Sequence, residues 1–285
     1  MDQADKQTRY RGRLAPSPTG YLHAGHAQTF WIARQRALNL GGDLILRNDD
    51  LDNQRCKSAY VEALFEDLQW FGFQWSEGPD RGGSFGPYSQ SQRQEIYRAA
   101  LRRLQLGAFV YPCSCSRKDI QSAVSAPHAA DDELIYPGSC RHKTLDDVGN
   151  QSHCWRFRVV DGEKIQLNDG HFGPVEFVAG KDFGDFVVWR PDGICSYQLA
   201  TVVDDCAMKI TEVVRGADLL VSTARQILIY RALGFPVPSF YHCPLMLDEK
   251  GQRMAKRQDA MSLRQLRQLG MTPEQIRESY FTAMC

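Results

Sequence analysis

The sequence contains no run of about 18 consecutive apolar residues, the length that a membrane-spanning helix needs. Its polar N-terminus, residues 1–7, has no apolar core of the kind found in a signal peptide. Net charge is also absent, with 34 basic and 34 acidic residues, which argues against a general nucleic-acid coat but not against local contacts. We find no internal repeats. These absences predict a cytoplasmic globular protein with no membrane partner.

The composition is that of a globular chain, with 43% hydrophobic and 24% charged residues. At 285 residues the chain can bury a sizeable core in one large or two modest domains. Its nine cysteines are odd in number, and without an export signal we expect reduced thiols or metal ligands. From Lys250 to Cys285, seven basic residues accompany three acidic ones, so this end suits either a phosphate-rich partner or a solvated helical face.

The first informative motif covers residues 13–26 and reads Arg-Leu-Ala-Pro-Ser-Pro-Thr-Gly-Tyr-Leu-His-Ala-Gly-His. It falls where a predicted strand over residues 10–15 gives way to a predicted helix over residues 24–40. The two prolines keep the helix from starting early. Gly20 and Gly25 allow the backbone to approach a ligand closely.

His23 and His26 belong to the N-terminal end of that helix. The free N–H groups and the dipole of a helix N-terminus suit phosphate. Both imidazoles can donate to phosphoryl oxygens and can stabilise the charge that develops when a carboxylate attacks the α-phosphate of ATP. The alternative interpretation is a pair of surface histidines at a helix cap.

Strands and helices alternate along the first part of the chain. A buried strand is expected at 43–47, a helix at 58–71 capped by Ser58, and another helix at 91–107, which indicates a doubly wound α/β sheet. The alternation then breaks, and residues 155–178 follow a β-like pattern. It resumes with a strand at 186–190.

These patterns predict a Rossmann-type parallel sheet that is interrupted by a smaller α+β insert and followed by a short helical C-terminal segment. Thr272 and Pro273 form a helix start in that segment. The predicted divisions are the first half of the sheet domain at 9–108, the insert at 109–185, the second half of the sheet domain at 186–247, and a loop with a helical tail at 248–285.

The second motif, Arg253-Met-Ala-Lys256-Arg257, follows a predicted strand and turn over residues 244–251. A mobile loop with cations can close on a triphosphate and stabilise the pentacovalent state during adenylate formation. Taken alone, the pentapeptide also fits a basic surface loop.

Charged residues cluster at predicted strand ends. The acids of Arg47-Asn-Asp49-Asp50-Leu-Asp52 end a strand, at the carboxyl edge where α/β folds bind ligands. The guanidinium groups of Arg13 and Arg215 suit a ligand carboxylate better than an amide. Ordinary ion pairs are the alternative.

Three cysteines have the spacing of metal ligands. Cys113 and Cys115 lie two residues apart and Cys140 lies 25 residues further on, which suits tetrahedral structural zinc in the insert. Three buried free cysteines are the alternative interpretation.

Taken together, the motifs resemble those of a known family. Residues 13–26 resemble the HIGH motif of class I aminoacyl-tRNA synthetases, and residues 253–257 resemble their KMSKS loop with Lys256 kept. The string that begins at Arg13 narrows the resemblance to the glutamyl branch. Only 28 residues follow Arg257, so we expect a shortened member of that branch without an anticodon-binding region.

The resemblance implies roles for individual residues. His23, His26 and Lys256 would be catalytic, and they would bind ATP together with Gly25. Asp49 stands where most relatives have Glu, and would hold the substrate α-amino group. The fourth zinc ligand would be Tyr136, with His142 as its rival. The expected glutamate-binding residues are Arg13, Leu14, Ala15, Pro16, Ser17, Asp49, Tyr197 and Arg215.

The shortened members imply a specific activity. The chain would activate L-glutamate with ATP and Mg²⁺ without needing tRNA, and transfer it to the queuosine base in the anticodon arm of tRNA(Asp). It would hold one structural Zn²⁺ and act as a monomer. The alternatives are a conventional glutamyl-tRNA synthetase whose anticodon domain is on another chain, and a catalytically idle RNA-binding paralogue.

Overall fold

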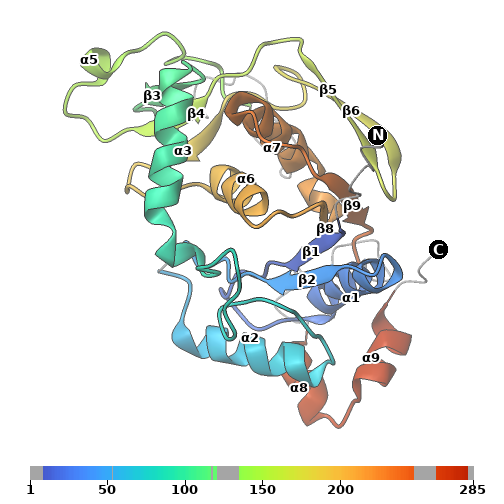
Figure 1. Ribbon diagram of the computed structural model, residues 1–285. Coiled ribbons are helices and arrows are strands. Elements are labelled where there is room, and N and C mark those ends of the chain that lie inside the picture. The colour runs from blue at the N-terminus through green and yellow to red at the C-terminus, as the bar shows by residue number, and fades with distance from the viewer. Residues whose placement is uncertain (1–8, 53, 117, 121–134, 247–260, 282–285) are drawn as a thin grey trace, which may run out of the picture. The chain divides into compact units, whose positions relative to one another are not determined.

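The computed structural model describes residues 9–52, 54–116, 118–120, 135–246 and 261–281 (Figure 1). Contacts within the chain define two compact units. The first unit comprises residues 1–92, 207–219 and 238–285, and the second comprises residues 93–206 and 220–237. In the described parts of the chain, no helix is long and apolar enough to span a membrane. The domain boundaries expected from the sequence remain predictions.

Parallel strands form the centre of the first unit (Figure 1). Strand β1 (Arg11–Leu14) pairs in parallel with β2 (Asp43–Leu46), and β8 (Glu212–Gly216) pairs in parallel with β9 (Ser239–Cys243). Beside β8, the Thr211 N–H donates to the Arg11 carbonyl oxygen at 2.9 Å, which brings β8 next to β1. The strands predicted at 10–15 and 43–47 are therefore confirmed, with the parallel order expected of this fold class.

Helix α1 (Ala24–Asn39) connects β1 to β2 and packs on the strands through a buried face. The helix begins at Ala24, as predicted from the sequence. Leu40, the last residue of the predicted helix, is the residue that follows the helix end and is 59% exposed. Helix α2 (Ser58–Trp70) was expected to have Ser58 as its cap, and this is wrong. Lys57 has the extended backbone of a cap residue, so Ser58 is already helical.

The first unit also contains η1 (Gln90–Gln92) and two short helices at the C-terminal end, α8 (Leu263–Gln268) and α9 (Pro273–Tyr280). Thr272 caps α9 by accepting from the Gln275 N–H at 3.3 Å, as predicted. Both helices contribute buried residues to the core that α1 and α2 share.

The second unit combines an antiparallel sheet with helices. Its sheet has the order β3 (Val110–Cys113), β4 (Cys154–Phe157) and β7 (Phe186–Trp189). The strand expected at 186–190 is present, and its partner is β4 rather than a parallel strand. The other elements of the second unit are the hairpin β5 (Lys164–Asp169) and β6 (Gly173–Val178) and the helices α3 (Gln94–Leu106), α5 (Leu145–Val148), α6 (Tyr197–Ala207) and α7 (Leu220–Leu233). The short helix η2 (Ala217–Leu219), just before α7, belongs to the first unit.

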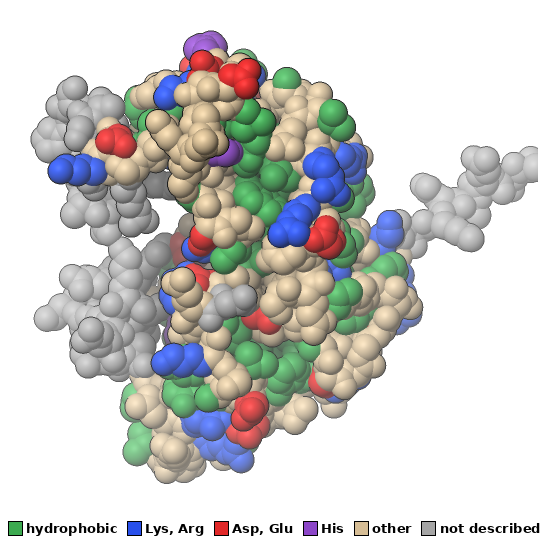
Figure 2. Space-filling model, turned by 90° about the vertical axis from the view of Figure 1, so that its left-hand side faces the viewer, with side chains coloured by type: hydrophobic (Ala, Val, Ile, Leu, Met, Phe, Trp, Pro, Cys, Tyr) green, Lys and Arg blue, Asp and Glu red, His purple; other side chains and the backbone are tan. Residues whose placement is uncertain are grey.

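A buried ion pair ties α3 to α6. Arg93 Nε lies 2.6 Å from Asp204 Oδ1, and the Tyr97 hydroxyl donates to Asp204 Oδ2 at 2.9 Å. The carboxylate therefore has a structural task in this unit. On the face seen in Figure 2, Lys and Arg side chains lie among Asp and Glu, in line with the balanced charge of the chain.

Candidate active site

Two chain segments lie side by side where β1 and β2 end. The Arg47 N–H donates to the Leu14 carbonyl oxygen at 2.8 Å, and the Asp49 N–H donates to that of Pro16 at 3.0 Å. Leu14, Ala15 and Pro16 therefore run beside Asp49 at the carboxyl edge of the parallel strands. The sequence predicted this edge as the ligand-binding edge. Ser17 follows as an exposed residue of a turn.

Asp49 is held by Arg47, a cation that was not among the predicted site residues. Arg47 Nε lies 2.6 Å from Asp49 Oδ1, and Arg47 Nη2 lies 3.3 Å from Oδ2. The Arg47 side chain is fully buried and that of Asp49 nearly so. A bidentate pair of this kind orients the carboxylate. The sequence signal for this pair is that Arg47 and Asp49 lie two residues apart at the end of a strand.

Two arginines lie on adjacent strands. Arg13 Nη1 donates to the carbonyl oxygen of Val214 at 2.9 Å, so Arg13 on β1 reaches the strand that carries Arg215. Arg215 Nε lies 3.4 Å from His242 Nε2, its neighbour on β9. Both arginines are buried. Two buried guanidinium groups therefore lie on the adjacent strands β1 and β8, and their expected binding of a substrate carboxylate stays a prediction.

His23 is the cap of helix α1. Its Nδ1 accepts from the Gly25 N–H at 3.1 Å, and its ring centroid lies 3.8 Å from that of His26. His26 Nδ1 accepts from the His23 N–H at 3.4 Å. A Cβ on Gly25 would come within 3.0 Å of the His23 ring, so the glycine makes room for this cap. The motif thus replaces the usual Ser or Asp cap with two imidazoles.

The cap also sets the protonation of both rings. Desolvation lowers the pKa of His23. The same cause, followed by repulsion from His23, lowers the pKa of His26, although part of this residue is exposed to solvent. Each Nδ1 accepts a backbone N–H, so each neutral ring carries its proton on Nε2. Among the described residues neither Nε2 has a hydrogen-bond partner, so both Nε2–H groups can donate to a ligand.

The two ends of the segment that carries the second motif lie beside the first motif. A Cβ on Gly25 would lie 3.7 Å from Met246 Sδ, just before the segment. Just after it, Ser262 forms an antiparallel bridge with His23, and the Leu263 N–H donates to the Leu22 carbonyl oxygen at 2.7 Å. Lys256 itself lies outside the described residues, as do Arg253 and Arg257. A strand was expected to begin at residue 244, and this is wrong for residues 244–246, because β9 ends at Cys243. Residues 247–251 lie outside the described residues.

Tyr197 begins α6 and is 40% exposed. It belongs to the second unit, whereas Arg13, Asp49 and Arg215 belong to the first. Its expected contact with the substrate stays a prediction.

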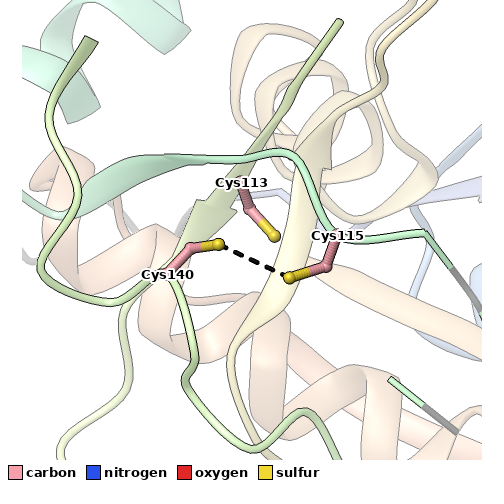
Figure 3. A group of neighbouring side chains, drawn as sticks. All are labelled: Cys113, Cys115 and Cys140. Carbon is pink, nitrogen blue, oxygen red and sulfur yellow. Dashed lines mark hydrogen bonds between the residues drawn. The ribbon is translucent and has the colours of Figure 1, made fainter. Parts of the chain in front are cut away.

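The three predicted thiols lie together in the second unit (Figure 3). The sulfurs of Cys113, Cys115 and Cys140 all lie within 4.8 Å of one another, and that of Cys115 is 3.4 Å from that of Cys140. Three sulfurs about 2.3 Å from one zinc ion would be about 3.8 Å apart, so the spacing is close to what the metal requires. A hydrogen bond from Cys154 is the leading cause that lowers the pKa of Cys113, which favours a thiolate there.

The Tyr136 hydroxyl lies among these thiols. Its oxygen is 3.4 Å from Cys113 Sγ and 3.5 Å from Cys115 Sγ, and accepts the Cys140 N–H at 2.8 Å. His142 is exposed and is not among the clustered donor atoms. Cys154, which showed no ligand spacing in the sequence, pairs with Cys113 across β3 and β4.

Comparisons with known proteins identify the family of this chain. A family model for the catalytic domain of class I tRNA synthetases (E and Q) matches residues 9–282. The glutamyl-Q tRNA(Asp) synthetase of Symbiobacterium thermophilum is 47% identical over 271 residues, which cover 93% of this chain and 83% of that protein. The protein of the same name from Nitratidesulfovibrio vulgaris is 44% identical, with the same coverage.

A solved structure shares the fold. The glutamate tRNA ligase of Elizabethkingia meningosepticum, in complex with its amino acid, superposes with a TM-score of 0.76 at 30% identity. The match covers 92% of this chain and 53% of that one, so the chain spans about half the length of that ligase. The parallel strands with their charged ends and the histidine-capped helix are the catalytic fold of a class I synthetase. The chain belongs to the glutamyl and glutaminyl (E and Q) class I tRNA synthetases, and it is an enzyme of that ligase family.

Proposed function

We propose that the chain activates L-glutamate with ATP and transfers the glutamyl group to the queuosine base in the anticodon arm of tRNA(Asp). In the first step a carboxylate oxygen of glutamate attacks the α-phosphorus of ATP, and the bond to pyrophosphate breaks. In the second step a queuosine hydroxyl attacks the carbonyl carbon of the adenylate, and AMP leaves with the bonding electrons.

Charge complementarity supports glutamate as the substrate. Glutamate carries two carboxylates and one ammonium group, and the residues expected to bind it in the first unit include two buried guanidinium groups, on Arg13 and Arg215, and one buried carboxylate, on Asp49, which Arg47 orients. Each substrate charge therefore has an opposite partner. Glutamine would leave one guanidinium facing a neutral amide, which costs binding free energy.

The capped helix supports ATP as the co-substrate. Neutral imidazoles at His23 and His26 present two Nε2–H donors where the helix dipole already favours phosphate. Gly25 keeps the approach to these donors open. Lys256 would add a positive charge to the leaving pyrophosphate, and Mg²⁺ bound with ATP would offset triphosphate charge.

The acceptor is the more specific part of the proposal. The observation that carries it is the name shared by relatives that are 47% and 44% identical over 93% of this chain, glutamyl-Q tRNA(Asp) synthetase. The experiment that tests the activation step is glutamate-dependent pyrophosphate exchange with no RNA present. Exchange with glutamate and not glutamine supports the proposal, and its absence in folded protein contradicts it. Transfer is tested with tRNA(Asp) that carries or lacks queuosine.

We also propose a structural zinc ion held by Cys113, Cys115, Cys140 and Tyr136. Three sulfurs and one phenol oxygen give the four donors of a closed tetrahedral site, with no open position for chemistry. When bound, the ion would cross-link the segments that carry these residues. His142 is the weaker candidate because its side chain is exposed.

A further inference from the structure

Arg156 on β4 contacts two of the four proposed zinc ligands. Its Nε lies 3.2 Å from Cys113 Sγ, and its guanidinium carbon lies 4.1 Å from the centre of the Tyr136 ring. The residue is 8% exposed, so this is a buried cation against the thiol cluster. The spacing of the cysteines in the sequence did not predict this contact of Arg156.

The register of the sheet puts the arginine there. In the β3–β4 pair, Cys113 lies opposite Cys154 and Tyr111 lies opposite Arg156. Because side chains two residues apart share a face of a strand, Cys154 and Arg156 face the same side as Cys113. Arg156 then reaches diagonally to the sulfur, a contact that antiparallel strands allow to long side chains.

In the part of the chain that the structure describes, no carboxylate forms an ion pair with Arg156. Among the residues that the structure describes, its guanidinium has two polar partners, Cys113 Sγ and the carbonyl oxygen of Asp185 at 3.3 Å. The Asp185 carboxylate accepts instead from Tyr111, Arg141 and the Val159 N–H. A buried cation without an anionic partner is costly, so the geometry calls for negative charge on the sulfur side.

A zinc ion with three thiolates and a tyrosine oxygen supplies that charge. The divalent cation cannot neutralise three thiolates, so the filled site carries one net negative charge with a neutral phenol, and two with a phenolate. In a buried cluster such an anion is stabilised by a nearby cation that donates to a ligand sulfur, the usual task of groups just outside the coordination shell.

We infer that Arg156 is a positioning residue of this cluster: it orients Cys113 and Tyr136 and compensates the negative charge of the zinc-bound site. The inference rests on the zinc site proposed above. Removing the charge should weaken zinc binding about 10- to 100-fold, the range found for groups outside the coordination shell.

The test measures the zinc dissociation constant of the full chain by competition with a chromogenic chelator. Arg156→Met keeps most of the aliphatic volume and removes the charge, whereas Arg156→Lys keeps the charge. Arg158→Met is the matched control. Arg158 lies two residues further on, stacks over Tyr111 with its guanidinium carbon 5.3 Å from the ring centre, and donates to carbonyl oxygens rather than to a thiol. The absorption of bound Co²⁺ reports in each variant whether all three thiolates still coordinate.

The expected result is weaker zinc binding in Arg156→Met, partial or full recovery in Arg156→Lys, no change in Arg158→Met, and thiolate–cobalt absorption in all of them. Wild-type affinity in Arg156→Met would overturn the inference while leaving the zinc site standing. Equal weakening in Arg158→Met would overturn it too, because the effect would then be general loosening. A wild-type protein that binds neither zinc nor cobalt would instead contradict the zinc site itself.

Discussion

Ser262 and His23 form an antiparallel bridge, so the chain returns to the helix cap directly after the segment that carries Lys256. Met246, just before that segment, lies beside Gly25 of the same cap. Residues on both flanks of the segment therefore lie beside the motif that is proposed to bind phosphate. This relationship joins two motifs that are more than 200 residues apart in the sequence.

Lys256→Ala should slow glutamate-dependent pyrophosphate exchange about a hundredfold or more, the usual cost of losing a group that stabilises transition-state charge. Glutamate binding without ATP should change little, because the lysine acts on phosphates. Exchange kinetics and isothermal titration separate the two effects. If Lys256→Ala keeps the wild-type rate, the double variant with Arg257→Ala shows whether Arg257 replaces it; an unchanged rate there means a surface loop.

Arg215→Gln should lower kcat/KM for glutamate more than a hundredfold. A buried charge pair broken on one side costs about 3–5 kcal/mol, and each 1.4 kcal/mol is about tenfold. Steady-state exchange measures this. Arg9→Gln is the matched control, because Arg9 is 68% exposed. A loss of only a few-fold in Arg215→Gln would show that this guanidinium does not bind a substrate carboxylate.

Stability should depend on pH through the two histidines. The lowered pKa values of His23 and His26 mean that the folded protein binds fewer protons than the unfolded chain below about pH 6.5. The stability that the neutral rings contribute is present above that pH and is lost as pH falls from there toward the folded pKa. Urea unfolding at about pH 7.5 and about pH 5.5 should therefore show a smaller decrease for His26→Gln than for wild type. Equal decreases in stability in His26→Gln and wild type would contradict the lowered pKa of His26.

Tyr136→Phe should lose zinc on dialysis, whereas His142→Ala should retain one zinc per chain. The tyrosine oxygen lies among the three sulfurs, and the histidine is exposed. Metal content by atomic emission distinguishes the variants. Loss of zinc in His142→Ala alone would show that His142, and not Tyr136, is the fourth ligand. Retention of zinc in both variants would show that the three thiolates hold the metal without either residue.

Local sequence predicted much of the first unit. The strand over residues 10–15, the helix after it and the acids ending β2 follow from proline, glycine and hydrophobic spacing within short segments. The partners of the predicted site residues, in the candidate active site and in the thiol cluster, come from distant segments of the chain. His242 reaches Arg215 only because β8 and β9 pair, and Arg156 reaches Cys113 across 43 residues only through the β3–β4 register. Spacing within one segment carries no information about such pairings.

The pairing of β7 shows the same limit. The strand itself was expected from the run Phe186-Val-Val-Trp189, because apolar β-branched and aromatic residues favour a strand. Its antiparallel partner β4 was not, since the run does not specify direction or neighbour. Element type was therefore predictable here, and topology was not.

The most direct test of the account is glutamylation of purified tRNA(Asp) from matched cells that differ only in queuosine synthesis, with tRNA(Glu) as the competing substrate. Labelled glutamate, ATP and Mg²⁺ are supplied, and the anticodon fragment is separated from the 3′ end by nuclease digestion. The account predicts label on the anticodon fragment of queuosine-containing tRNA(Asp) and none on tRNA(Asp) that lacks it. Equal labelling of the two tRNA(Asp) preparations, or preferential labelling of the 3′ end of tRNA(Glu), would contradict it.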